Sequence, residues 1–225
     1  MDKVKEKRLK HKVFIVDDHP IVRQGLAQLI NQEIDFTVCG DAGDVPQALK
    51  AVADAHPDIV IVDISLGHSS GIKLVEDLVS RYPDLFILIL SMHEESVYAE
   101  RCLGAGARGY IMKQEPPEQV ISALKKIING EIFISDKLSI KLLHRIVNRK
   151  SGVYSSPIDR LSNRELEVFR LIGQGLKTRK IAEHLNLSIK TIETYVDHIK
   201  KKMNFEDSRN LFLHAVQWLM NEDTK

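Results

Sequence analysis

Short continuous runs of apolar residues recur through the first part of the chain. Four of them are Val13–Val16, Ile59–Ile64, Leu85–Leu90 and Tyr110–Met112, and a shorter one is Phe36–Cys39. Runs of this kind suit strands that are buried on both faces, as in a parallel sheet. Between the runs, apolar residues recur with helical spacing. Five such strand and helix units predict a doubly wound α/β domain.

The pattern changes after Gly130, where the strand-like runs stop. Residues 137–147 have the spacing of a short amphipathic helix, and the polar segment 148–157 carries Gly, Ser and Pro, as linkers do. From Leu161 onward every apolar pattern is helical. We therefore expect a basic tail over 1–11, an α/β domain over 12–131, a linker with a short helix over 132–158, and an all-α domain over 159–225.

Charge is divided unevenly between these parts. Residues 13–136 carry 9 Lys and Arg against 19 Asp and Glu, whereas residues 159–225 carry 12 against 10. An acidic first domain and a more basic second one fit a nucleic-acid partner for the second alone. No run approaches the roughly 20 apolar residues of a membrane helix, and Met1–His11 lacks the apolar core of a signal peptide. We expect a cytoplasmic protein with no membrane partner.

Polar residues follow the ends of the predicted strands. Asp17 and Asp18 follow the first strand and Asp63 the third. In a flavodoxin-like strand order of 2-1-3-4-5, ligands bind outside the carboxyl ends of the strands, so these carboxylates converge. Converging carboxylates repel one another unless a cation such as Mg²⁺ is present. Ser91 and Lys113 end the fourth and fifth strands, and a hydroxyl and an ammonium beside such carboxylates suit a phosphoryl group.

Other interpretations of these residues stay open at this point. Asp18-His-Pro20 alone suits a helix N-terminus, but that leaves Asp63, Ser91 and Lys113 unexplained. An aspartyl phosphatase of the haloacid dehalogenase type needs a second Asp two residues after its nucleophile, where Ser65 stands. A nucleotide-binding enzyme wants a Gly-rich loop after the first strand, which this chain does not have.

The segments VDDHP (16–20), VDIS (62–65), LSMH (90–93) and ARGYIMK (107–113) resemble the receiver domain of bacterial two-component response regulators. The resemblance implies that Asp63 accepts a phosphoryl group from a sensor histidine kinase. It implies ligands for Mg²⁺ or Mn²⁺, namely Asp17, Asp18, Asp63 and the backbone carbonyl of Ser65. It also implies that Ser91 and Lys113 bind the phosphoryl group and that Tyr110 is an aromatic switch that swings inward. The protein is then no enzyme beyond, at most, autodephosphorylation.

The chain departs from the receiver pattern beside the acceptor. Gly67 stands where most receivers have Pro, so we expect a more mobile loop there. Ser65 and His93 occupy the two positions that tune dephosphorylation in such proteins.

The last part of the chain carries signals for four helices. Ser162-Asn-Arg-Glu165 is a capping box for the first. Thr178 and Ser188 are suited to cap the next two, and the last helix is expected over Ser208–Met220. On a helical wheel of the third helix, one face is apolar and is expected to meet the core: Ile189, Ile192, Val196, Ile199 and Met203. The opposite face is polar: Lys190, Thr194, Asp197, His198 and Lys201. A short helix, a tight turn and a longer helix predict a helix-turn-helix.

Leu161–Phe169, Ile181–Leu185 and Ser188–Thr194 resemble the LuxR-type output domain, so the whole chain resembles a NarL/FixJ-type response regulator. The resemblance implies phosphate contacts from Arg179, Lys190 and Thr191. It implies base contacts from the third helix: Glu193, Thr194, Asp197 and His198, with Lys201 beside them. Asp197 stands where basic residues are frequent, and its carboxylate would repel phosphate but accept a hydrogen bond from cytosine.

The resemblance also implies a homodimer that binds promoter DNA and regulates transcription, with dimerisation and DNA binding modulated by phosphorylation. The stripe Leu211, Ala215, Trp218 and Leu219 suits either the core or a dimer surface. A competing interpretation is a receiver that no longer uses phosphate, with constitutive DNA binding.

Overall fold

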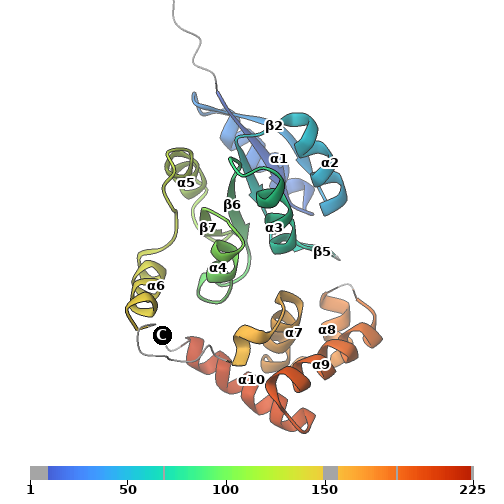
Figure 1. Cartoon of the computed structure of the whole chain (residues 1–225). Helices are drawn as coiled ribbons and strands as arrows, with labels where there is room; N and C mark the ends of the chain where they lie inside the picture. The colour runs from blue at the N-terminus through green and yellow to red at the C-terminus, as the bar shows by residue number, and fades with distance from the viewer. Residues whose placement is uncertain (1–9, 68, 149–156, 186, 224–225) are drawn as a thin grey trace, which may run out of the picture. The chain divides into compact units, whose positions relative to one another are not determined.

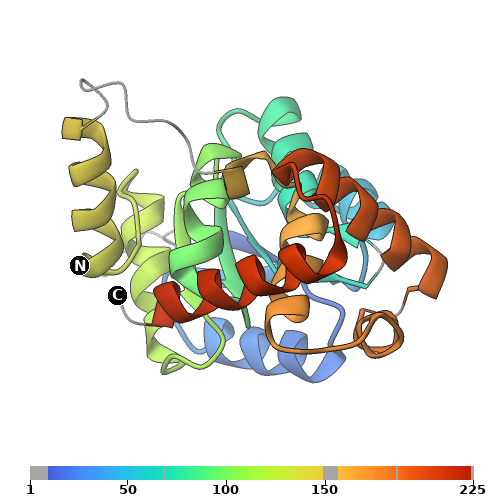
Figure 2. The same cartoon turned by 90° about the horizontal axis from the view of Figure 1, so that it is seen from below.

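The computed structural model describes residues 10–67, 69–148, 157–185 and 187–223. These residues form two compact units, with the division between Ile140 and Lys141 (Figures 1 and 2). Most of the predicted tail, and residues 149–156 of the predicted linker, lie outside the described residues. No helix in the described ranges is long and apolar enough to cross a lipid bilayer.

The first unit is built on a parallel sheet of five strands in the order β2-β1-β3-β6-β7 (Figure 1). The strands are β1 (His11–Val16), β2 (Phe36–Ala42), β3 (Ile59–Val62), β6 (Phe86–Ser91) and β7 (Gly109–Met112). Ile15 pairs with Ile61, and Ile61 pairs with Leu88, across the buried middle of the sheet. The flavodoxin-like strand order predicted from the apolar runs is confirmed.

Four helices connect these strands and a fifth follows the last strand, and together they cover the sheet. They are α1 (Pro20–Asn31), α2 (Val45–Ala55), α3 (Gly71–Arg81), α4 (Glu95–Gly104) and α5 (Glu118–Ile128). Ile30 of α1 and Leu124 of α5 share one core with Val13 and Ile15 of β1. Because strand side chains alternate between faces, a second set of apolar residues points the other way, toward α2, α3 and α4, which contact one another in succession.

Two small features of this unit were not predicted from the sequence. Strands β4 (Ser65–Leu66) and β5 (Ser69–Ser70) pair antiparallel beside Asp63, and Gly67 between them has a φ of +55°. Phe133, beyond α5, forms a parallel bridge with Gly109 of β7. The chain then enters α6 (Asp136–Asn148), the predicted short helix, in which Leu138 is buried.

The second unit is helical, as predicted. A 3₁₀ turn, η2 (Pro157–Arg160), precedes four α-helices: α7 (Asn163–Gly173), α8 (Thr178–His184), α9 (Ile189–Met203) and α10 (Ser208–Asp223). The predicted capping box at the start of α7 is present, with Ser162 and Glu165 bonding each other's backbone amides. Phe169, Ile192 and Leu211 are fully buried and bring α7, α9 and α10 together.

Two details of this unit correct the sequence analysis. The N-cap of α8 is Lys177, with no side-chain hydrogen bond, and Thr178 is the first helical residue rather than the cap. Ile189 was expected on the apolar face of α9, but it is 48% exposed because it lies in the first turn, beyond the packed part of the helix.

Candidate functional site

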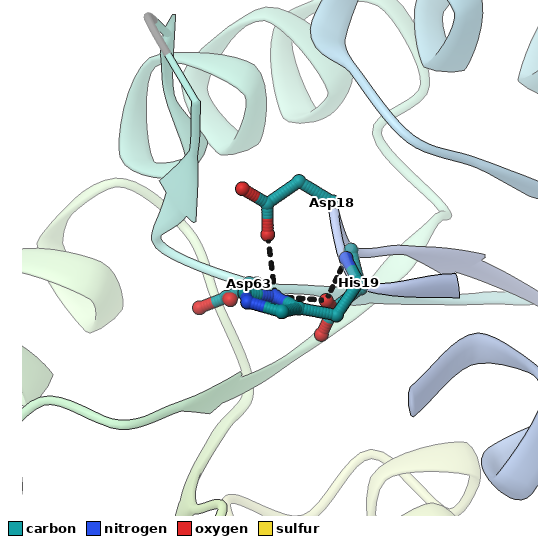
Figure 3. A group of neighbouring side chains, drawn as sticks. Asp18, His19 and Asp63 are labelled. Carbon is teal, nitrogen blue, oxygen red and sulfur yellow. Dashed lines mark hydrogen bonds and ion pairs between the residues drawn. The ribbon is translucent and has the colours of Figure 1, made fainter. Parts of the chain in front are cut away.

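Carboxylates gather at the carboxyl edge of the sheet in the first unit. Asp17 follows β1 and Asp63 follows β3, and both are buried, at 1% and 3% exposure. Ligand atoms of Asp17, Asp18, His19 and Asp63 all lie within 4.8 Å of one another. Figure 3 shows the Asp18 carboxylate pointing toward the His19 ring, whose Nδ1 is 2.7 Å from Asp18 Oδ1 and 3.2 Å from Asp17 Oδ1.

Lys113 closes this cluster from the loop after β7. Its Nζ lies 2.6 Å from Asp17 Oδ2 and 2.6 Å from Asp63 Oδ2, and the ammonium is itself mostly buried. The backbone amide of Lys113 donates to the carbonyl of Ser91 at 2.8 Å, which continues the β6–β7 pairing to the edge of the sheet. Two buried carboxylates are therefore bridged by one buried cation, an arrangement that a folded protein retains only with close pairing.

The protonation of this pair follows from burial and from the close contact. Burial raises the pKa of Asp63 above its ordinary value, although Lys113 acts in the opposite direction. Burial lowers the pKa of Lys113, but Asp63 and Asp17 raise it more strongly, so the ammonium stays charged. The Asp63 carboxyl therefore lies beside a charged ammonium in a site from which water is largely excluded.

Ser91 and Tyr110 lie next to the same edge. Ser91 is fully buried at the end of β6, and its Oγ accepts a hydrogen bond from the amide of His93 at 3.3 Å. Tyr110 is also buried, and its hydroxyl donates to the carbonyl of His93 at 2.8 Å. The aromatic side chain expected to swing inward therefore already points inward in this structure.

The β4–β5 hairpin brings a second polar contact to Asp63. The amide of Ser65 donates to Asp63 Oδ1 at 3.3 Å, and the Ser65 hydroxyl lies 2.8 Å from Nε2 of His93. The His93 ring in turn packs against the Tyr98 ring, with centroids 4.6 Å apart. The hairpin is therefore joined to Asp63 and, through His93, to Tyr98 of α4.

A second site is presented by α8 and α9 in the second unit. Ser188 caps α9, with its Oγ accepting from the amide of Thr191 at 3.0 Å. Among the residues expected to meet DNA, those exposed on α9 are Lys190, Glu193, Thr194, Asp197, His198 and Lys201. Arg179 lies on α8, is 81% exposed and pairs with Glu183 at 3.4 Å. The polar face predicted from the wheel is therefore at the surface.

The buried carboxylate of Glu165 links α7 to this helix. Its Oε2 accepts hydrogen bonds from the amide of Ser162 at 2.7 Å and from Lys202 Nζ at 2.6 Å. Its Oε1 lies 3.6 Å from Nδ1 of His198. His198, which was expected to meet DNA, therefore also contacts the residue that links α7 to α9. Burial works to raise the pKa of Glu165, but the bonds from Lys202 and Ser162 lower it below its ordinary value.

Comparison with protein families assigns both units. The response regulator receiver domain matches residues 13–125, and the luxR family of bacterial regulatory proteins matches residues 159–215. The chain belongs to the LuxR-type response regulators. This response regulator is 35% identical over 210 residues to the oxygen regulatory protein NreC of Staphylococcus carnosus, covering 92% of this chain and 97% of the relative. It is 32% identical over 221 residues to the transcriptional regulatory protein DegU of Brevibacillus brevis, covering 92% and 94%.

Solved structures agree with this family. The RcsB protein of Salmonella enterica serovar Typhimurium, solved on promoter P1flhDC with the phosphomimetic BeF₃⁻, is 27% identical, with a TM-score of 0.58 and coverage of 92% of this chain and 98% of that one. A LuxR-family response regulator from Aurantimonas is 30% identical, with a TM-score of 0.57, and it covers 62% of this chain and 99% of its own. This chain is therefore a two-component response regulator with a LuxR-type DNA-binding domain.

The response regulator gathers the predicted receiver residues at one edge of its sheet. His93, which the sequence analysis gave a role in dephosphorylation, reaches the site through Ser65. Two further residues contribute that the sequence analysis did not place there: His19, through its contacts with two carboxylates, and Gly71. A Cβ on Gly71 would lie 2.0 Å from the Asp63 carbonyl oxygen, so only glycine lets α3 begin beside the acidic cluster. An imidazole directly after two Asp residues was the one sequence signal that pointed to His19.

Proposed function

We propose that Asp63 accepts a phosphoryl group and that its phosphorylation controls promoter binding by the second unit. The observation that carries this proposal is the position of Asp63 itself. It is a buried carboxylate with an ammonium 2.6 Å from Oδ2 and an amide donor at Oδ1. Such a group is well suited as a nucleophile whose product, an anionic acyl phosphate, would be stabilised by fixed positive charge.

The transfer forms one bond and breaks one bond. A carboxylate oxygen of Asp63 attacks the phosphorus of a phosphohistidine on a sensor kinase, the new O–P bond forms, and the P–N bond to the imidazole breaks. The histidine nitrogen keeps the bonding electron pair and later takes a proton from solvent. Lys113 Nζ, already at the Asp63 carboxylate, would pair with the transferred oxygens. Return of the phosphoryl group to water is the autodephosphorylation expected of such a site.

The donor set fits a hard divalent cation. Asp17 Oδ2 and Asp18 Oδ1 are buried and make no hydrogen bond of good geometry, and Asp63 supplies a third carboxylate. Oxygen ligands of this kind suit Mg²⁺ or Mn²⁺, and we propose Asp17, Asp18, Asp63 and the carbonyl of Ser65 as the protein ligands. The bound ion would supply positive charge to the phosphoryl oxygens. Asp18 and His19 must separate for the carboxylate to take this role.

Ser91 and Tyr110 are the proposed relay from Asp63 to the surface. Ser91 is fully buried and its Oγ is bonded to the amide of His93 in the loop after β6. A hydrogen bond from this hydroxyl to a phosphoryl oxygen would draw that loop toward Asp63. The Tyr110 hydroxyl is bonded to that same loop through the carbonyl of His93. A shift of the loop therefore changes the surface formed by α4 and β7, as phosphorylation switches do when a local contact biases a bistable element.

The second unit is the proposed DNA reader, with α9 in the major groove as helix-turn-helix proteins place their second helix. The proposed DNA contacts are Arg179, Lys190, Thr191, Glu193, Thr194, Asp197, His198 and Lys201. A promoter complex of the relative RcsB supports this role.

We propose domain boundaries of 12–131 and 159–225, action in the cytoplasm, where chromosomal DNA is reached, and a homodimer as the DNA-bound form.

The experiment compares the full chain with its Asp63→Asn variant. Both are incubated with acetyl phosphate and Mg²⁺, and then analysed by intact mass and by binding to fragments of the promoter that the wild type occupies in cells. We expect the wild type alone to gain one phosphoryl group and to bind promoter DNA more tightly after treatment. Asp84→Asn, which removes an exposed carboxylate before β6, is the matched control and should behave like the wild type.

Phosphorylation of Asp63→Asn would show that another residue is the acceptor. Equal promoter affinity of the wild type with and without the phosphodonor would instead support constitutive DNA binding.

A further inference from the structure

Two carboxylates stand one helical turn apart on the exposed face of α9. Glu193 and Asp197 are both exposed, and their i, i+4 spacing places them on the same side of the helix. Like charges at this spacing repel each other and slightly destabilise a helix. The pair therefore costs the fold a small amount of stability rather than contributing to it.

The packing of α9 does not need this pair. The core side of the helix is formed by Ile192 and Ile199, which are fully buried. Asp197 pairs with Lys200 at 2.9 Å, and the bond to Lys200, with Lys201 and His198 nearby, lowers the pKa of Asp197. Among the described residues, Glu193 forms no ion pair. Positive charge around Asp197 also offsets the repulsion that this carboxylate would exert on DNA phosphates.

The chemistry of a carboxylate limits what it can read in the major groove. An ionised carboxylate accepts hydrogen bonds and donates none. Guanine presents two acceptors there and repels a carboxylate, whereas adenine places the N7 acceptor beside its N6 donor and so suits an amide better than a carboxylate. Cytosine presents its N4 amino group as a donor, and carboxylates are its usual side-chain partners.

We propose that Glu193 and Asp197 are specificity-determining residues that select cytosine in each half-site of the operator. This inference rests on the proposed placement of α9 in the major groove. Four residues of helix rise by about 6 Å, and successive bases are separated by about 3.4 Å. The two selected C·G pairs therefore lie within about two base pairs of each other.

The test is selection from randomised double-stranded DNA with full-length protein held in beryllofluoride and Mg²⁺. The wild type is compared with Glu193→Gln and Asp197→Asn, which keep side-chain size and remove the charge. Amides pair with the N6 and N7 atoms of adenine. In each variant we therefore expect one enriched cytosine to be replaced by adenine, with about a tenfold loss of affinity for the wild-type site.

Glu206→Gln removes the same charge from the exposed turn before α10 and is the matched control. It should enrich the wild-type sequence. A purely electrostatic role of Glu193 and Asp197 predicts a different result, because both variants would then bind every sequence more tightly without a change in the enriched bases. That result, or a wild-type motif without responsive cytosines, overturns the inference. Failure of the wild type to enrich any sequence would instead overturn the proposed DNA-binding function.

Discussion

At the scale of single residues, Glu165 shows how one buried charge supports the position of α9. It accepts hydrogen bonds from the N-terminus of α7 and from Lys202 of α9, and its pKa is lowered by these bonds. A carboxyl whose pKa is lower in the folded state than in the unfolded chain stabilises the fold above the unfolded value, about 4.3 for Glu. This stabilisation is lost as the pH falls from that value through the folded pKa.

We expect Glu165→Gln to lower the free energy of unfolding of the second unit by about 2 kcal/mol at pH 7. The difference from the wild type should shrink as the pH falls below about 4.3, because the carboxyl of the unfolded chain then takes up a proton while the folded one still resists protonation. Urea unfolding followed by the fluorescence of Trp218, whose ring lies 5.7 Å from Phe169, reports on this unit. A difference in the free energy of unfolding that stays constant down to pH 3 would contradict the role given to the charge. Glu206→Gln is the control and should unfold like the wild type.

Gly71 is a second residue whose identity is fixed by its neighbours. Gly71→Ala would place a methyl group 2.0 Å from the Asp63 carbonyl oxygen and 2.8 Å from the Ile64 Cα. Both are backbone atoms, which cannot relieve the clash by a change of rotamer. We expect a loss of stability of more than about 2 kcal/mol in the first unit, by calorimetry, and loss of phosphoryl uptake by mass. Gly25→Ala in α1, where no atom lies within 4 Å, should stabilise by about 1 kcal/mol. Normal phosphorylation of Gly71→Ala would show that Asp63 tolerates displacement.

At the scale of elements, the segment after α5 is attached to the β7 edge of the sheet. The Phe133 carbonyl accepts from the amide of Tyr110 at 2.9 Å, and the Phe133 amide donates to the carbonyl of Arg108. The Ser135 amide then donates to Glu95 Oε1 at 2.8 Å, and the Ser135 hydroxyl bonds the same carboxylate. The start of α6 is thereby tied to both β7 and α4.

We expect Glu95→Ala to loosen the first turn of α6, because Ser135 loses its partner on α4. Amide hydrogen exchange at Leu138 and Ser139 should become about fivefold faster, which corresponds to about 1 kcal/mol. Glu94→Ala removes the neighbouring exposed carboxylate, which makes no capping bond, and should leave exchange unchanged. Equal exchange in all three proteins would mean that β7 alone holds this segment.

The strands that could be predicted from the sequence were those formed by consecutive buried apolar residues. Strands such as Ile59–Val62 and the acidic residues after them could be predicted because a buried parallel strand needs an unbroken run. The β4–β5 hairpin could not, since Ser65-Leu66 and Ser69-Ser70 have no such run. The position of Phe133 depends on pairing with Gly109, 24 residues earlier in the chain. Ile189 was wrongly expected to be buried. A helical wheel shows which way a side chain points from the helix, but it does not show how far along the helix the neighbouring elements pack against it.

At the scale of the whole molecule, charge is separated between the acidic receiver and the more basic second unit. Binding to DNA should therefore weaken steeply with salt, since each neutralised phosphate releases counterions. We expect Lys201→Ala to reduce the slope of log K against log salt by about 1, measured by fluorescence anisotropy at several salt concentrations. Lys50→Ala, an exposed change in α2 of the receiver, should leave the slope unaltered. An unchanged slope in Lys201→Ala would remove that residue from the phosphate contacts.

The attachment of Phe133 to β7 has a practical consequence for the construction of hybrid regulators. A junction placed directly after α5, where the helical pattern ends at Ile128, would take away the residue that completes the hydrogen bonds of Tyr110 and Arg108. The donor of the receiver should therefore contribute its chain through Ile140, so that the sheet edge and the first turn of α6 come from the same parent. In hybrids joined at Gly130, the edge of β7 would face a segment from the other parent. Loss of signalling in such hybrids would then result from the junction rather than from incompatible domains.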